Sequence, residues 1–280
     1  MLTLPTHVAT RYVVPLREGG SLPAVVETEA GGLYVVKLRG AGQGARALAA
    51  ELIVGLLATH LGLPVPELAL IDVDPAFGRT EGDPEIQDLL RASHGLNVGL
   101  RFLDGAFNYD PLAGAALVSP ALAADIVWLD ALVSNVDRTP RNPNLLIWHR
   151  GVWLIDHGAA LYFHHHWPAV DDATARRPFT HIEDHVLLPL ASDLRAADAR
   201  LAGRLDADVI EAILAAVPDD LVAPGAGGPG AAFDTPAAAR AAYARYLAAR
   251  LAAPRAFVEE AVASRAKRAG GPGGGRGAAR

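Results

Sequence analysis

A predicted β-hairpin in the middle of the chain constrains its fold more than any other sequence feature. Residues 145–148 and 152–155 are two apolar runs that are rich in strand-forming residues. The short link between them, residues 149–151, has the length and the glycine expected of a tight turn. We therefore expect two antiparallel strands whose outer ends lie side by side.

Polar side chains flank both outer ends of this hairpin. Asn142 and Asn144 lead into the first strand, Asp156 follows the second strand, and Asp137 lies on the preceding loop. Because neighbouring antiparallel strands are about 4.8 Å apart, we expect these side chains to gather at one end of the hairpin. Their oxygens are hard ligands, which suit Mg²⁺ and phosphate chemistry better than zinc.

The same residue types are also ordinary turn formers. Asp, Asn and Pro are common in loops, and an Asn-Pro-Asn sequence before a strand is compatible with loop chemistry alone. However, the chain has five asparagines, and three of them, at positions 135, 142 and 144, fall in this one loop. That concentration favours a functional site over simple turn chemistry.

The segment resembles the catalytic and metal-binding segments of the protein-kinase-like fold, in the variant shared by HipA-type kinases and phosphatidylinositol kinases. The motif is Asp137-Arg138, then Asn142 at the fifth position after the aspartate, then the hairpin and Asp156-His157-Gly158. The last three residues stand where the wider family has Asp-Phe-Gly, so the phenylalanine packing is not carried over. Chain length and the remaining pattern favour a compact HipA-like kinase.

The composition fits a folded domain, argues against direct nucleic-acid binding and excludes disulfides and thiolate metal sites. The chain has 280 residues, of which 51% are hydrophobic, so it can bury a full core. A formal net charge of -6 gives no electrostatic footprint for direct nucleic-acid binding, apart from a basic C-terminal tail. Cysteine is absent, which excludes disulfides and thiolate metal sites. The chain shows neither a signal-peptide pattern nor an apolar run of membrane-spanning length, so a cytoplasmic protein is expected.

A lysine within an apolar strand is the second feature that needs an explanation. The chain has 25 basic residues, and only Lys37 and Lys267 are lysine. Lys37 lies in a predicted strand, residues 33–38. The helix predicted over about residues 45–60 is apolar on nearly every side, so Glu51 within it should be buried and need a partner. Lys37 is the expected partner, because it is the only lysine before position 267. The alternative is that Glu51 is exposed on a slightly polar side of the helix.

The kinase resemblance gives these residues roles. In that fold a strand lysine and a helix glutamate form an ion pair, and the lysine holds the α- and β-phosphates of ATP. The resemblance further implies that Asn142 and Asp156 bind Mg²⁺, and that Asp137 orients or deprotonates the acceptor hydroxyl. Arg141 either stabilises charge on the transferred phosphoryl group or is only a solvated turn residue.

The N-terminal part is predicted to form an antiparallel sheet that binds the nucleotide. Strands are expected at residues 8–16, 24–28, 33–38, 68–73 and 98–103. The resemblance implies that the loop with Gly19, Gly20 and Ser21 covers the ATP phosphates, although adjacent glycines suit any hairpin. It also implies that backbone groups of Arg101, Phe102 and Leu103 hydrogen-bond adenine at a hinge.

The remainder is expected to be mainly helical. Ser119 is a cap for a helix over residues 120–133, which leads into the catalytic loop. Asp130 in this helix either braces that loop or is an ordinary exposed carboxylate. Further helices are expected at residues 192–202, 206–217 and 235–268, the last broken near Pro254. The histidines at 164–166 are assigned no metal, because neighbouring side chains on an extended chain point to alternate faces.

These features together predict a two-lobed, protein-kinase-like α+β fold. Residues 1–104 would form an ATP-binding N-lobe, residues 105–268 a helical C-lobe with the catalytic loop and metal site, and residues 269–280 a disordered tail. The resemblance implies an ATP- and Mg²⁺-dependent phosphotransferase that acts on Ser or Thr of a protein, with an antitoxin-like or regulatory partner. Alternatives are a small-molecule kinase, a nucleotide-binding pseudokinase or interaction module, and, from glycines 40, 42 and 44, a Rossmann enzyme.

Overall fold

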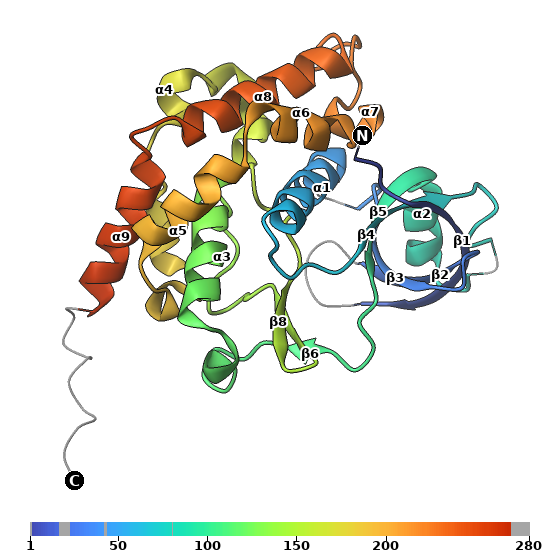
Figure 1. Ribbon diagram of the computed structural model, residues 1–280. Helices are drawn as coiled ribbons and strands as arrows, with labels where there is room; N and C mark the ends of the chain where they lie inside the picture. The colour runs from blue at the N-terminus through green and yellow to red at the C-terminus, as the bar shows by residue number, and fades with distance from the viewer. Residues whose placement is uncertain (1, 17–22, 42–43, 80, 270–280) are drawn as a thin grey trace.

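A small β-barrel lies beside a larger, mainly helical part (Figure 1). The computed structural model describes residues 2–16, 23–41, 44–79 and 81–269. The barrel strands are β1 (Thr6–Pro15), β2 (Ala24–Thr28), β3 (Leu33–Lys37), β4 (Leu68–Val73) and β5 (Gly95–Arg101). A second sheet consists of β6 (Phe107–Asn108), β7 (Leu145–Trp148) and β8 (Gly151–Leu154). The chain is therefore a mixed α/β protein, as its sequence predicts.

Helices account for most of the second half of the chain. Helix α1 (Gly44–His60) follows β3, and α2 (Pro84–Arg91) packs against the barrel core. The helical part contains α3 (Pro120–Leu132), α4 (Asp172–Ala175), α5 (Leu194–Leu201), α6 (Ala207–Ala215), α7 (Asp219–Val222), α8 (Pro236–Leu251) and α9 (Ala256–Ala269). Short 3₁₀ segments lie at Ala115–Leu117, Tyr162–Ala169, Thr180–Asp184, Leu188–Leu190 and Ala202–Arg204. Of the predicted tail, residues 270–280 lie outside the described part.

The first sheet closes into a barrel, which the sequence did not predict. Its strands are neighbours in the order β1, β2, β3, β5, β4, and most pairs are antiparallel as expected. Closure comes from a parallel pairing of β1 with β4, through residues 6–8 and 70–72. Such a pairing joins distant segments and depends on the accumulated twist of the sheet, which strand patterns do not reveal.

Helix α1 fills the junction between the barrel and the helical part (Figure 1). Every residue from Ala47 to Ala58 is buried, as its uniformly apolar sequence predicts. The helix packs against β4 and β5 on one side and against α6 and α7 on the other. Because each buried leucine or isoleucine contributes roughly 1.5–3 kcal/mol, α1 is firmly held and carries Glu51 into the core.

Strands β7 and β8 form the predicted hairpin. They pair antiparallel along their whole length, and His149 and Arg150 form the turn with φ values of 47° and 63°. Positive φ at both central turn residues is the geometry that matches the twist of two-residue hairpins. Beyond the strands, the N–H of Ile155 donates to the carbonyl of Asn144 at 3.1 Å, so the outer ends lie side by side as expected.

The predicted helices form with capped first turns. The side chains of Ser119, Asp206 and Thr235 accept hydrogen bonds from backbone N–H groups in the first turns of α3, α6 and α8. Helices α8 and α9 are separate, with the break around Pro254 where the sequence predicts it. Capping at α3 fixes the start of the helix that leads into the predicted catalytic loop.

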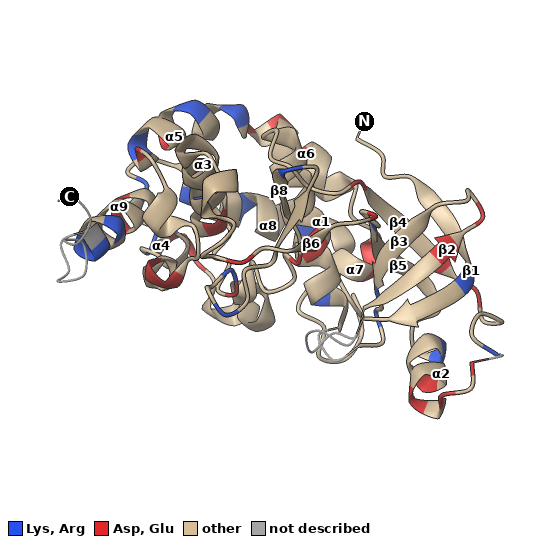
Figure 2. Cartoon of the chain, turned by 90° about the horizontal axis from the view of Figure 1, so that it is seen from below, with Lys and Arg blue, Asp and Glu red and all other residues tan. Residues whose placement is uncertain are grey.

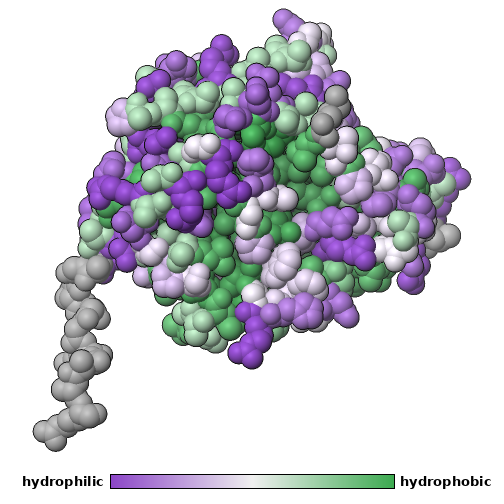
Figure 3. Space-filling model, in the orientation of Figure 1, coloured by the Kyte–Doolittle hydropathy of each residue, from purple (hydrophilic) through white to green (hydrophobic). Residues whose placement is uncertain are grey.

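Charged residues of both signs are mixed over the chain (Figure 2). Basic residues close the last turn of α9, at Lys267 and Arg268. Figure 3 shows that hydrophilic and hydrophobic residues are also interspersed on the face it presents. Within the described ranges, every helix is too short or too polar to cross a membrane.

Candidate active site

Lys37 lies at the centre of the first group of charged side chains. Its Nζ donates to Oε2 of Glu51 at 2.6 Å and to Oδ1 of Asp156 at 2.5 Å. The same Oε2 accepts the backbone N–H of His157 at 2.7 Å. Strand β3, helix α1 and the segment after β8 thus meet at one ammonium group. The predicted Lys37–Glu51 pair is present, and Asp156 is a third member that sequence reasoning did not assign to it.

We refer to Lys37, Glu51 and Asp156 as the open cluster, because its last member reaches solvent. Glu51 is 0% exposed, whereas the side chain of Asp156 is 37% exposed. Burial alone would lower the pKa of Lys37, but the carboxylates of Glu51 and Asp156 outweigh burial and raise it. Burial raises the pKa of Glu51, against the effect of Lys37. Burial would also raise the pKa of Asp156, but Lys37 holds it below its usual value.

Asp137 and two asparagines form a second group at the end of the hairpin. Oδ2 of Asp137 accepts from Nδ2 of Asn142 at 2.7 Å and from Nδ2 of Asn144 at 3.1 Å. The N–H of Asp137 donates to Oδ1 of Asn135 at 3.1 Å. Hydrogen bonds therefore join three of the four side chains expected to gather at this end of the hairpin, Asp137, Asn142 and Asn144. Arg141 lies exposed on the same loop, and none of the described acidic side chains forms an ion pair with it.

A third group lies beneath this loop and is buried completely. Oδ2 of Asp130 accepts from Nε of Arg138 at 2.5 Å and from Nε2 of His185 at 2.9 Å, and its Oδ1 accepts from Asn135 at 2.9 Å. We refer to Asp130, Arg138 and His185 as the sealed cluster. Asp130 is 0% exposed, so of the two alternatives left open by the sequence the structure selects the loop brace.

The hydrogen bonds of His185 give the protonation state of its ring in the sealed cluster. Nδ1 of His185 accepts the N–H of Leu187 at 3.0 Å, so the ring proton is on Nε2 and the imidazole is neutral. Burial lowers the pKa of His185 in the same sense. Burial would raise the pKa of Asp130, but Arg138 and His185 together hold it far below its usual value. The cluster is thus a carboxylate, a guanidinium and a neutral imidazole.

Arg138 also connects the sealed cluster to the hairpin. Its guanidinium donates to the carbonyls of Asn144 and Ile155, the latter at 3.3 Å, and to Nδ1 of His157 at 3.2 Å. Burial, and then Arg138, lower the pKa of His157 to about 3. His157 is therefore a neutral acceptor in the position where the wider kinase family has phenylalanine.

Backbone strain is concentrated around these groups. Ser134, Asn144, Asp156 and Leu161 have φ values of 50–54°, and they are, apart from the hairpin turn, the non-glycine residues with positive φ in the described chain. Each such conformation costs on the order of 1–3 kcal/mol and persists only where the surroundings fix it. Such strain is typical of functional sites.

The predicted adenine contacts at the end of β5 are partly occupied within the fold. The N–H of Arg101 donates to the carbonyl of Glu67 at 2.8 Å, and the N–H of Phe102 donates to the carbonyl of Leu33 at 2.9 Å. Leu103 follows and is 9% exposed. Three predicted phosphate contacts lie outside the described residues: Gly19, Gly20 and Ser21.

The donor atoms at the hairpin fit a Mg²⁺ ion. Asp156 uses Oδ1 for Lys37, and its Oδ2 accepts from no described residue; the same holds for Oδ1 of Asn142. Mg²⁺ prefers such oxygen ligands and shares them with phosphate groups. No three His, Cys, Asp or Glu side chains of the described chain surround a common metal position. In the kinase-like site that the sequence resembles, a carboxylate and an amide share the metal with the nucleotide, so no such trio is required.

Sequence reasoning missed two residues of this site. His185 lies 55 residues from Asp130, and no local pattern marks it as a partner. Arg138 stands next to Asp137, but its side chain turns inward to Asp130. The one available signal was Asp130 itself, a carboxylate in a mainly apolar helix, which requires a partner if it is buried.

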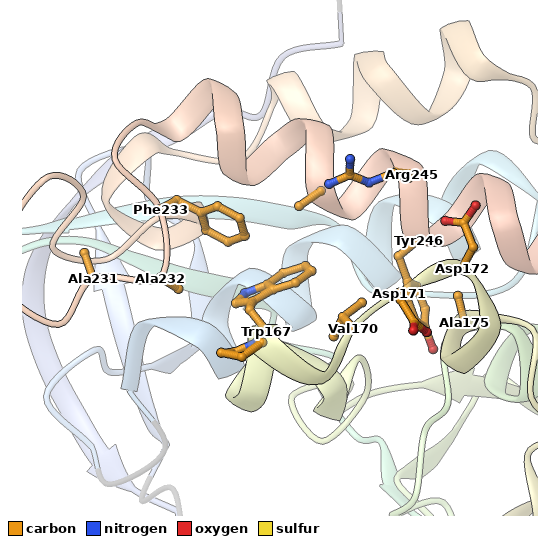
Figure 4. Close-up of a pocket in the computed structure, with 12 residues that line it drawn as sticks. Trp167, Val170, Asp171, Asp172, Ala175, Ala231, Ala232, Phe233, Arg245 and Tyr246 are labelled. Atoms are coloured by element: carbon orange, nitrogen blue, oxygen red, sulfur yellow. The ribbon is translucent and has the colours of Figure 1, made fainter.

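A pocket of about 350 Å³ is lined by other residues (Figure 4). Trp167, Phe233 and Tyr246 contribute aromatic walls, and Asp172 and Arg245 are among its polar residues. None of the residues that line this pocket belongs to the open cluster, the sealed cluster or the Asp137 group. The pocket is therefore distinct from the candidate active site.

Comparisons with known proteins relate the chain to kinases. A family model described as HipA-like kinase matches residues 10–220. The crystal structure of a Helicobacter pylori proinflammatory kinase, CtkA, is similar with a TM-score of 0.53 and 13% sequence identity, covering 96% of this chain and 100% of that chain. At that identity the likeness concerns the fold. No curated protein sequence matches the chain.

Proposed function

The chain belongs to the HipA-like kinase family, and we propose that it transfers the γ-phosphate of ATP to a hydroxyl group with Mg²⁺ as cofactor. The family and the kinase fold support phosphotransferase activity. By analogy with the family, the proposed acceptor is Ser or Thr of a protein. The observation that carries the proposal is that the open cluster and the Asp137 group are attached at the same end of the hairpin, where the N–H of Ile155 donates to the carbonyl of Asn144.

Lys37 has the role of holding the nucleotide phosphates in this proposal. Glu51 is buried and fixed by two hydrogen bonds, so it keeps the ammonium group in place. Asp156 is the exposed partner and the one that can leave. Lys37 then exchanges Asp156 for phosphate oxygens, which frees both carboxylate oxygens of Asp156. The barrel and the helical part act as the two lobes, with their boundary near residue 104.

Asp156 and Asn142 are the residues that would hold Mg²⁺, since each keeps a free oxygen. When bound, Mg²⁺ neutralises charge on the phosphates. Asp137 keeps Oδ1 free and orients the acceptor hydroxyl. The acceptor oxygen bonds to the γ-phosphorus as the bond to ADP breaks, and its proton passes to Asp137. We assign Arg141 to the charge on the transferred group.

Two aspartate variants test these roles. Asp137→Asn keeps the side-chain shape, so the Kd for Mg²⁺-ATP should stay within a few fold while transfer falls by roughly 10²–10⁴. Asp156→Asn should weaken both binding and transfer. Calorimetry with ATP, with and without Mg²⁺, gives the Kd, and labelled ATP gives the rate of transfer to the chain itself or to proteins of an extract.

Asp234→Asn, at an exposed position outside the site, is the matched control and should behave as wild type. Transfer at the wild-type rate by Asp137→Asn would show that the catalytic assignment is wrong. Tight binding of NAD without any response to ATP would instead support the Rossmann alternative.

A further inference from the structure

Arg250 of α8 is a buried cation that donates hydrogen bonds to four backbone carbonyls. The residue is 3% exposed, and no described carboxylate pairs with it. Nε donates to Leu132 at 2.5 Å and Nη2 to Ala131 at 2.5 Å. Nη1 donates to Ala175 at 2.8 Å and to Arg177 at 3.3 Å. Each nitrogen of the guanidinium is thus engaged.

The surroundings of Arg250 compensate for its burial. Carbonyls at helix C-termini lack intrahelical donors and carry the negative end of the helix dipole, so they suit a cation. The guanidinium carbon also lies 5.9 Å from the ring centroid of Tyr246 and 4.9 Å from that of Phe257. A buried charge with this many directed contacts favours one geometry of the elements around it.

The four carbonyls belong to two segments that flank the candidate active site. Two end helix α3, which leads directly into the catalytic loop, residues 134–144. Of the other two, the carbonyl of Ala175 ends helix α4 and that of Arg177 lies two residues beyond it. Both are within residues 159–190, the segment that follows the metal-binding Asp156. Two backbone hydrogen bonds join the same segments: Leu161 N–H to Val133 at 2.8 Å, and Val186 N–H to Arg138 at 3.0 Å.

Many kinases order the segment after the metal aspartate by phosphorylation, because the phosphate binds arginine side chains. In residues 159–190 the hydroxyl groups are those of Tyr162, Thr174 and Thr180. The Thr174 hydroxyl accepts from the N–H of Asp171 and donates to its carboxylate, both at 2.8 Å, so a phosphate there would break the α4 cap. Arg250 is buried and already bonded to the backbone of this segment.

We propose that Arg250 is a positioning residue that fixes the catalytic loop and the segment after Asp156 in one arrangement, without phosphorylation of that segment. Its structural part stands on the contacts of Arg250 alone. Its catalytic part rests on the proposed phosphotransferase function. The experiment therefore has two arms, one of which needs no activity.

The first arm is amide hydrogen exchange on Arg250→Met and on a matched control, Arg240→Met. Arg240 lies on the same helix and donates to the carbonyls of Leu214 and Val217, at 2.9 and 2.6 Å, at the end of α6. Arg250→Met should speed exchange by about tenfold or more in residues 133–144 and 172–190. Arg240→Met should not. Equal exchange in the two variants would overturn the inference.

The second arm measures turnover and ATP affinity. Arg250→Met should lower kcat for transfer by about tenfold or more, with the Kd for ATP within about threefold, since a displaced loop loses orientation rather than binding. Arg250→Lys keeps the charge but cannot span both helix ends, so it should recover part of the rate. Thr180→Ala and phosphatase-treated wild type should transfer at the wild-type rate.

The two arms separate failure of the inference from failure of the proposed function. A wild type that transfers no phosphate contradicts the proposed function, while the exchange arm still decides the positioning role. A rate lost on phosphatase treatment, or a kcat for Arg250→Met no lower than that of Arg240→Met, overturns the inference. If Arg250→Met does not fold, Arg250→Lys carries both arms.

Discussion

The open and sealed clusters are both groups of charged side chains in the interior, but they differ in access to solvent. The members of the sealed cluster, Asp130, Arg138 and His185, are 0%, 1% and 3% exposed. In the open cluster, Asp156 has a side chain that is 37% exposed. The sealed cluster therefore cannot exchange a partner without unfolding, whereas the open cluster can.

The two clusters also differ in how many of their carboxylate oxygens accept hydrogen bonds. Both carboxylate oxygens of Asp130 accept hydrogen bonds. Oε1 of Glu51 is buried and has no partner among the described residues, and Oδ2 of Asp156 accepts from none of them. Complete pairing is typical of a permanent brace, and spare acceptors are what a ligand site requires. The comparison separates structural charge from functional charge within one core.

Removing Asp130 should break the sealed cluster with the largest effect on stability. Asp130→Asn leaves the guanidinium of Arg138 buried without its counter-ion, so the free energy of unfolding should fall by about 3–5 kcal/mol. Urea denaturation measures the change. The control is Glu259→Gln, which breaks an exposed ion pair with Arg195 and should leave the midpoint almost unchanged. Equal midpoints for the two variants would contradict a bracing role for Asp130.

Removing the charge of Glu51 should have a smaller effect on stability and a clear effect on binding. In Glu51→Gln, Lys37 keeps Asp156 as a counter-ion, so we expect a loss of only about 1–3 kcal/mol. Without Glu51, however, Lys37 is held mainly by the partner that should leave on nucleotide binding. The Kd for Mg²⁺-ATP should therefore rise about tenfold, which corresponds to about 1.4 kcal/mol. Unchanged affinity by calorimetry would show that Glu51 does not position Lys37.

The open cluster could be predicted in part because its signals are local. One lysine in a strand and one carboxylate in an apolar helix leave few pairings, and the hairpin places Asp156 near the two asparagines. Asp156 and Lys37 are 119 residues apart in the sequence, and their contact depends on how the barrel packs against the hairpin. No sequence pattern encodes that docking.

The sealed cluster and the barrel closure could not be predicted, because both depend on long-range geometry. His185 meets Asp130 only after the chain has passed through the hairpin and α4. The closing pair of β1 and β4 depends on twist accumulated over the intervening strands. Helix bounds, by contrast, follow from caps and breakers close in sequence, such as Ser119 and Pro254.

Acidification should act in one direction on His185 of the sealed cluster and on its neighbour His157, and in the other direction on Glu51 of the open cluster. The folded-state pKa of His185, and that of His157 at about 3, lie below the ordinary 6.5, so the unfolded chain binds these protons first. Their contribution to stability is complete above pH 6.5 and is lost as the pH falls below it. The pKa of Glu51 is raised above 4.5, so its protonation favours the folded state on acidification. Between pH 6.5 and 5, the loss therefore comes from the histidines.

The expected size of this loss follows from the shift at His157. At pH 5 a histidine that stays neutral in the fold costs about 2 kcal/mol relative to an unfolded chain that protonates it. Urea denaturation at pH 7.5, 6 and 5 should show a fall of at least this size in wild type. In His157→Phe, the decrease in the free energy of unfolding between pH 7.5 and pH 5 should be smaller by about 2 kcal/mol, whatever the stability of the variant at pH 7.5. His181→Gln, at an exposed position, should show the same decrease as wild type. An equally steep fall in His157→Phe would show that His157 is protonated in the folded protein, and its role as the neutral acceptor for Arg138 would then be wrong.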